Sequence, residues 1–260
     1  MRTADTRSGA DVPGHHGNGA TAGGAPGPSV AAVPGGPHPA RLHQNPAPGP
    51  DRGPEERTPT VTTVVAAAIR LCAGENRTAE FTKLNPMRRV PVMVDGKFTL
   101  TESDAILKYL ATKPGVPEHW YPRQPERRAR VDEYTAWHHS NTRPHAAKVF
   151  ILEVLLPAQT GGQVEQERLD GALAQLDATL DRLESMFLRR QPFLCGDDVS
   201  VADLLALCEL MQPAASGRDV LQGRPQLQRW RSRVQAAVCH AFHQAHAVLL
   251  AVRERRRAKL

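Results

Sequence analysis

The sequence predicts a small α/β segment over residues 61–113, followed by an all-helical segment over residues 125–258. Two short β-prone runs flank an Asp-Gly pair in the first segment, which is typical of a hairpin. In the second segment apolar residues recur every three or four positions, as in amphipathic helices. Two closely spaced prolines separate the segments and predict a linker over residues 114–124. Residues 1–60 are rich in Pro and Gly and nearly lack large apolar side chains, so we expect a disordered tail.

The α/β segment is expected to start with a strand at Val61–Ile69, because its first residues are β-branched, although its Ala-rich end would also suit a helix. One or two helical turns are expected over residues 78–83. A hairpin over residues 92–100 follows. Its turn is predicted at Asp95-Gly96, because glycine accepts the positive φ that a tight turn requires.

A helix is predicted directly after the hairpin. Thr101 or Ser103 can cap its first turn, and the acidic side chains of Glu102 and Asp104 suit the positive end of the helix dipole. Its apolar positions are Ala105, Ile106, Leu107, Tyr109 and Leu110.

The helical segment is expected to open with one long helix from Pro125 to about Glu153, kinked at Pro144. A break is expected at 157–162. Ser200 and Asp203 have the spacing of a capping box, which predicts a helix start. The further predicted helices cover residues 169–190, 200–211, 225–238 and 242–257.

The formal net charge is +6, and part of it lies in the basic run Arg253–Lys259. Such a run can contact nucleic acid or an anionic membrane, but cations also suit a solvated helix C-terminus. We expect the second, and therefore neither nucleic acid nor a membrane as partner. Without a long apolar run or a hydrophobic leader, a cytoplasmic protein is predicted.

The cysteines are too widely spaced for a zinc site or a disulfide framework, so free thiols in a reducing compartment are expected. They are Cys72, Cys195, Cys208 and Cys239. The histidines near the N-terminus lack the rigid spacing of metal ligands, and no metal site is predicted.

A series of motifs between Gly74 and Leu250 resembles the theta class of the cytosolic glutathione S-transferases. In chain order they are NPMRRVPV at 85–92, DGKFTLTESDAILKYL at 95–110, HWYP at 119–122, RARVDEYTAW at 128–137, FLCGDDVSVADL at 193–204, ELMQP at 209–213 and GRPQLQRWRSRV at 223–234. The resemblance implies a thioredoxin-like α/β domain followed by a helical domain, as a homodimer. It also implies conjugation of glutathione to an electrophilic small molecule, with glutathione as co-substrate and no other cofactor.

The resemblance implies that Pro91 follows a cis peptide bond. The main chain of Val90 would then hold the cysteinyl part of glutathione by strand addition. The bare residues also fit a proline that merely starts an edge strand. Ser103 and Glu102 would bind the γ-glutamyl end, the first through the helix N-terminus and the second through its carboxylate. The same two residues equally fit a simple helix cap.

Three further residues take roles by the same resemblance. Arg89 would bind the glycyl carboxylate of glutathione. Asn76 occupies the position where the family often carries a His that also contacts the glycyl end. Arg143 would face the sulfur and stabilise the thiolate, although a surface arginine explains it equally well.

The chain departs from the family where the catalytic serine should lie. Ser8 and Ser29 are the only upstream serines, and neither has a strand–turn–helix setting. Cys72 does not open a helix and is a poor substitute nucleophile. We therefore expect an incomplete thioredoxin-like domain, from an incomplete or alternative product with a foreign N-terminus. A non-catalytic scaffold or interaction protein is the alternative function.

Overall fold

The computed structural model describes residues 74–258. The predicted tail over residues 1–60, the predicted strand Val61–Ile69, Cys72 and Lys259 lie outside the described residues.

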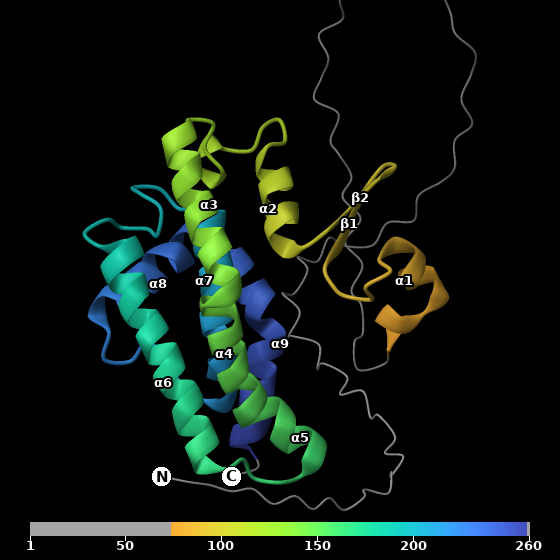
Figure 1. Ribbon diagram of the computed structural model, residues 1–260, viewed down its shortest axis with the longest axis vertical. Coiled ribbons are helices and arrows are strands. Elements are labelled where there is room, and N and C mark those ends of the chain that lie inside the picture. The colour runs from red at the N-terminus through yellow and green to blue at the C-terminus, as the bar shows by residue number, and fades with distance from the viewer. Residues whose placement is uncertain (1–73, 259–260) are drawn as a thin grey trace, which may run out of the picture.

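The α/β part is a short helix, a two-stranded hairpin and a second helix (Figure 1). After a 3-10 turn come α1, the antiparallel strands β1 and β2, and α2, which lies beside the helical part. Thr78 caps α1 by accepting a hydrogen bond from the main-chain N–H of Phe81. The bounds are Glu75–Arg77 for the turn, Ala79–Leu84 for α1, Val92–Asp95 for β1, Phe98–Thr101 for β2 and Ser103–Ala111 for α2.

The hairpin turn lies one residue later than predicted. Asp95 is the last residue of β1 and pairs with Phe98, so the turn consists of Gly96 and Lys97. Gly96 has the positive φ, 60°, that the turn requires. The carboxylate of Asp95 also accepts a hydrogen bond from the hydroxyl of Tyr109 on α2, at 2.6 Å, so this end of the strand is tied to the helix.

Helix α2 starts without the predicted side-chain cap. Thr101 is still in β2, and Glu102 alone turns the chain from strand to helix, with a φ of 67°. No side chain caps the first turn, and Ser103 is buried as the first helical residue. The tight strand-to-helix connection leaves Thr101 no room to act as a cap.

The helical part surrounds α7, which packs against α2, α3, α4 and α8. Helices α3 and α4 follow one another along the molecule, and α6 lies alongside α4 (Figure 1). The helices are α3 Pro125–Ser140, α4 Thr142–Phe150, α5 Leu156–Thr160, α6 Gln166–Arg182, α7 Val201–Met211, α8 Pro225–Val238 and α9 His240–Arg257. Shorter turns are the 3-10 turns Glu118–Trp120 and Gln212–Ser216 and the π turns Ile151–Leu155 and Leu183–Leu188.

The predicted long helix is interrupted one turn before Pro144, so that it consists of two helices rather than one kinked helix. The break lies at Asn141, with φ −127° and ψ −79°. A proline ring clashes with the carbonyl four residues earlier, here that of Ser140, so α3 ends there and Pro144 lies in the first turn of α4. The chain then stays helical past Pro157, where a break was expected. Helix α5 ends at Gly161, whose φ is 68°.

The other predicted helices are confirmed with small shifts. Helix α8 has the predicted bounds, and α9 begins two residues earlier. The helix expected over residues 169–190 consists of α6 and the π turn after it. Ser200 caps α7 as predicted, in a complete capping box with Asp203.

Asp203 is fully buried and joins three segments. One carboxylate oxygen accepts hydrogen bonds from the N–H of Leu194 at 2.9 Å and from the indole of Trp230 at 2.8 Å. The other accepts from the N–H of Ser200 at 2.9 Å. Burial raises the pKa of Asp203 although these hydrogen bonds oppose the shift. The capping box therefore also connects α7 to α8.

Cys195, Cys208 and Cys239 are free thiols. Burial raises the pKa of Cys195 and raises that of Cys208 to about 11, which leaves both unreactive.

Within residues 74–258 no three potential ligand side chains gather around a metal position. None of the described helices combines the length and apolar character that crossing a membrane requires.

Candidate functional site

The loop before β1 contains the predicted cis peptide bond, between Val90 and Pro91. Val90 makes no main-chain hydrogen bond to another described residue. Its N–H and C=O are therefore free, within the described chain, to pair with an extended peptide as an added strand would.

Two buried asparagine amides hold this loop in place. Asn76 donates to the carbonyl of Arg88 at 2.8 Å, and Asn85 donates to the carbonyl of Arg89 at 2.8 Å. The Nδ2 atom of Asn76, which sequence reasoning directed at a ligand, therefore fixes the loop from inside. Arg89 is exposed, and its guanidinium has no partner among the described residues.

The strand register brings the two predicted contact regions together. Val92 pairs with Thr101 as the last pair of the ladder. Pro91 on one strand and Glu102 on the other therefore leave the ladder at the same end. The free main chain of Val90 and the N-terminus of α2 therefore lie at the same end of the hairpin.

Ser103 and Glu102 differ in exposure. Ser103 is 6% exposed, and its hydroxyl has no hydrogen-bond partner among the described residues. Glu102 is exposed. A hydroxyl at a helix N-terminus suits a carboxylate, and an exposed carboxylate beside it suits an ammonium group. Together these groups match the zwitterionic end of an amino acid.

The hairpin and α2 are fastened together at the far end of β1. Lys113 contacts the carboxylate of Asp95 at 2.5 Å, and Tyr109 donates to the same oxygen. The hydrogen bond from Lys113 lowers the pKa of Asp95, and that from Tyr109 adds to the shift. These contacts therefore fix the position of the hairpin relative to α2.

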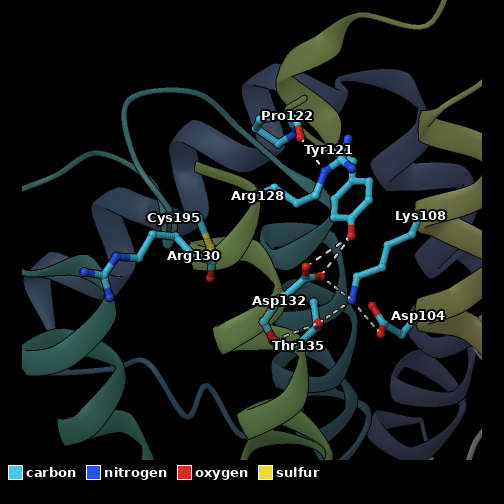
Figure 2. A network of polar contacts seen from close by, with 9 residues as sticks. All are labelled: Asp104, Lys108, Tyr121, Pro122, Arg128, Arg130, Asp132, Thr135 and Cys195. Carbon is cyan, nitrogen blue, oxygen red and sulfur yellow. Dashed lines mark hydrogen bonds and ion pairs between the residues drawn. The ribbon is translucent and has the colours of Figure 1, made fainter. Parts of the chain in front are cut away.

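A second network fastens α2 to α3 (Figure 2). The ammonium of Lys108 lies 2.9 Å from Asp104, 2.8 Å from Asp132 and 2.7 Å from the hydroxyl of Thr135. Tyr121 donates to Asp132 at 3.0 Å. Burial opposes the charge of Lys108, but the hydrogen bonds to Asp132 and Asp104 outweigh it and raise the pKa of Lys108. The N-terminus of α2 is thus held against the helical part.

Arg143 lies in the first turn of α4, after the break, rather than on the first helix of the helical part. Its Nε is 3.6 Å from a carboxylate oxygen of Glu209 on α7. The Arg143 side chain is 29% exposed and that of Glu209 only 3%. Burial raises the pKa of Glu209 to about 7, against the opposing effects of Arg143 and Gln212.

Sequence reasoning missed Glu209, Asn85 and Lys108. Glu209 carries a signal, because a lone acid within the apolar face of a helix needs a partner. Asn85 bonds to the carbonyl of Arg89 within its own loop, and Lys108 pairs with Asp104 one turn earlier on α2, so both had a local signal. Only the contacts of Lys108 with Asp132 and Thr135 lie on another segment.

Known protein families match both parts of the chain. The family model described as "Glutathione S-transferase, N-terminal domain" matches residues 64–112, and "Glutathione S-transferase, C-terminal domain" matches residues 142–237. Mouse glutathione S-transferase theta-1 is 46% identical over 187 residues, 72% of this chain and 78% of the mouse protein. The chain belongs to the theta class of the glutathione S-transferases. Human glutathione S-transferase theta-2B is 41% identical over 72% of this chain and 76% of its own length.

Solved theta-class structures share the fold. Human glutathione S-transferase T1-1 in its apo form has a TM-score of 0.68 at 44% identity, over 71% of this chain and 78% of that one. Human glutathione transferase theta-2, solved with glutathione, has a TM-score of 0.68 at 40% identity, over 73% and 78%. The predicted glutathione S-transferase fold, a thioredoxin-like domain followed by a helical domain, is confirmed. The described part of the first domain is the two-stranded hairpin with α1 and α2.

Proposed function

We propose that this theta-class chain binds glutathione across the end of the hairpin and transfers it to electrophilic small molecules. The observation that carries the proposal is the register of β1 and β2, which brings the free main chain of Val90 beside Glu102 and Ser103. Glutathione is an extended peptide with an amino-acid head, and this juxtaposition offers a partner for each part.

Each end of the peptide has a matching group. The main chain of Val90, before Pro91, pairs with the cysteinyl residue. Ser103 and the N-terminus of α2 bind the γ-glutamyl carboxylate, and Glu102 binds the ammonium. Arg89, exposed beside the loop, binds the glycyl carboxylate. Asn76 supports the loop through its hydrogen bond to Arg88.

Arg143 stabilises the thiolate in this proposal. The terminal nitrogens of its guanidinium donate to no described residue, so they are free to face an anion. A nearby cation lowers the pKa of a thiol and increases the share of thiolate. The thiolate attacks an electrophilic carbon, a new C–S bond forms, and a halide or similar group leaves with the electron pair.

We also propose that this chain acts in the cytoplasm as a homodimer, with glutathione and the electrophile as its ligands and no further cofactor. A glutathione-binding scaffold without turnover is the second candidate, since residues 74–258 offer contacts for glutathione but none of their serines is assigned to its sulfur.

One experiment separates the two candidates. The full chain of 260 residues is titrated with glutathione by calorimetry and assayed with a reactive aryl halide. Binding with conjugation supports the transferase, and binding without conjugation supports the scaffold. A folded chain that binds no glutathione would contradict both, and Pro91→Ala serves as the variant expected to lose binding.

A further inference from the structure

We propose that Glu209 is a positioning residue for Arg143. Its buried carboxylate holds one side of the guanidinium, so that the two terminal nitrogens are presented to the sulfur of bound glutathione. The inference rests on the proposed function, because it assigns Glu209 a role in the thiolate stabilisation that Arg143 provides.

The carboxylate of Glu209 is fixed by two contacts, one at each oxygen. One oxygen lies 3.6 Å from the Nε of Arg143. The other accepts a hydrogen bond from the amide of Gln212, at 2.5 Å. Because both oxygens are engaged, the carboxylate has a defined orientation, and so does the guanidinium that it contacts.

The surroundings make Arg143 the one charged partner of Glu209 among the described residues. Tyr134 on α3 is buried, and burial raises its pKa well above the usual value. His138, which faces Arg143, has a pKa lowered to about 3 by burial. On α7, burial raises the pKa of Cys208 to about 11. These three groups are neutral around pH 7, and no described ionisable group on α2 or α8 interacts with Glu209.

The geometry of Arg143 is what an anion site requires. Its Nε contacts the buried acid, while its side chain remains partly exposed. None of the described residues accepts a hydrogen bond from its terminal nitrogens. An anchored guanidinium loses fewer rotamers when an anion binds, so it stabilises the anion more effectively than a free surface arginine does.

The pair also responds to pH near neutrality. With a pKa of about 7, Glu209 gains a proton on mild acidification and loosens its contact with Nε. The orientation of Arg143 therefore depends on pH. The charge on Arg143 does not, because arginine stays protonated.

The test is a double-mutant cycle of Glu209→Gln, Arg143→Ala and both together. Binding, kcat and KM for glutathione are measured. The pKa of the bound thiol is read from the ultraviolet absorbance of its thiolate as a function of pH. Glu209→Gln is expected to lower kcat roughly 10-fold and to raise the thiol pKa by about one, with little change in KM. On the Arg143→Ala background the same substitution is expected to change kcat less than about 2-fold.

Glu153→Gln is the matched control. Glu153 is also a partly buried acid paired with one arginine, Arg218. It is expected to alter stability and leave the thiol pKa unchanged. If Glu209→Gln fails to fold, Gln212→Met removes only the second contact of the carboxylate. It should shift the thiol pKa in the same direction by less, and only while Arg143 is present.

The outcomes separate the two proposals. A wild-type chain that neither binds nor conjugates glutathione overturns the proposed function and this inference with it. A wild-type chain that conjugates glutathione, while Glu209→Gln has no effect or an equal effect on both backgrounds, overturns only the role of Glu209.

Discussion

Ser103 combines burial with a hydroxyl that has no hydrogen-bond partner among the described residues. Buried polar groups are nearly always paired, and unpaired ones in native structures call for an explanation. In the proposed site the missing partner is the γ-glutamyl carboxylate of glutathione. The stability of the free protein should then depend little on this hydroxyl.

Ser103→Ala is therefore expected to weaken glutathione binding roughly 10-fold, because it removes a hydrogen bond to a charged group. The unfolding free energy should change little. Ser200→Ala is the control, because Ser200 belongs to the capping box of α7. Its loss should cost about 1 kcal/mol of stability and leave glutathione binding unchanged. Calorimetry and urea unfolding give both quantities, and equal losses of stability in the two variants would contradict the assignment.

Glu209 also makes stability depend on pH. Burial raises its pKa from 4.5 to about 7, so between these values the folded chain holds a proton that the unfolded chain has lost. The contribution of the Glu209 proton to the unfolding free energy is complete below pH 4.5 and declines as the pH rises to 7. Relative to Glu209→Gln, the wild-type unfolding free energy should fall by roughly 3 kcal/mol across this range. Urea unfolding at a series of pH values measures the difference, in which the shared histidines cancel. If the unfolding free energies of the wild type and Glu209→Gln changed in parallel with pH, this role of Glu209 would be refuted.

Single residues were predictable where a short motif specifies a local backbone. The bare residues Val90-Pro91 and Glu102-Ser103 also fitted an edge-strand proline and a simple helix cap, and it was the resemblance to the family that implied the cis bond now seen at Pro91. The function of Asn76 could not be predicted, because its amide donates to a carbonyl twelve residues away. Glu209 was missed for the same reason, since its partner lies on another helix.

At the scale of elements, Lys108 connects α2 to α3 through three partners from two helices (Figure 2). Lys108→Met leaves Asp104 and Asp132 without their shared cation. We expect a loss of roughly 2 kcal/mol in stability and a weaker affinity for glutathione, because the N-terminus of α2 loses its support. Thermal unfolding and calorimetry measure the two effects.

Lys148→Met is the control for that variant. Lys148 is an exposed lysine with a single hydrogen bond, to Gln175. Its removal should change stability by less than about 0.5 kcal/mol. If both lysine variants had the same effect, the network at Lys108 would not support α2.

The elements themselves were largely predictable from periodicity, and their ends were not. The starts of α7 and α8 are exceptions that were predicted, because α7 begins with a capping box and α8 with a proline. Pro144 was expected to kink one long helix, and its ring, whose steric effect acts one turn earlier, instead divides that helix at Asn141. The hairpin turn was off by one residue, because Asp95 pairs with Phe98 as the last residue of β1 and leaves Gly96 and Lys97 as the turn.

At the scale of the whole molecule, Asp203 holds the helical part together. It accepts hydrogen bonds from Leu194, Ser200 and Trp230, on three segments, while fully buried. Asp203→Ala leaves these donors unsatisfied and should cost roughly 4 kcal/mol of unfolding free energy.

Urea unfolding of the full chain measures that loss. Asp198→Ala serves as the comparison, because Asp198 is exposed and paired only with Arg127. It should cost less than about 0.5 kcal/mol. Similar midpoints for the two variants would show that Asp203 does not organise the helical part.

The fastening of the hairpin to α2 has a consequence for the kind of glutamyl linkage that the chain accepts. Asp95, Tyr109 and Lys113 prevent the strands from sliding along the helix, so the span between Val90 and Ser103 is constant. In γ-linked glutamate the ammonium and the free carboxylate are on the same carbon. In the α-linked isomer of glutathione, which has identical atoms and charges and the same number of atoms between carboxylate and amide, the ammonium is on the carbon beside the amide instead. With its carboxylate at Ser103, the isomer therefore places its ammonium away from Glu102 and should compete poorly. The site then selects its ligand by the position of the ammonium.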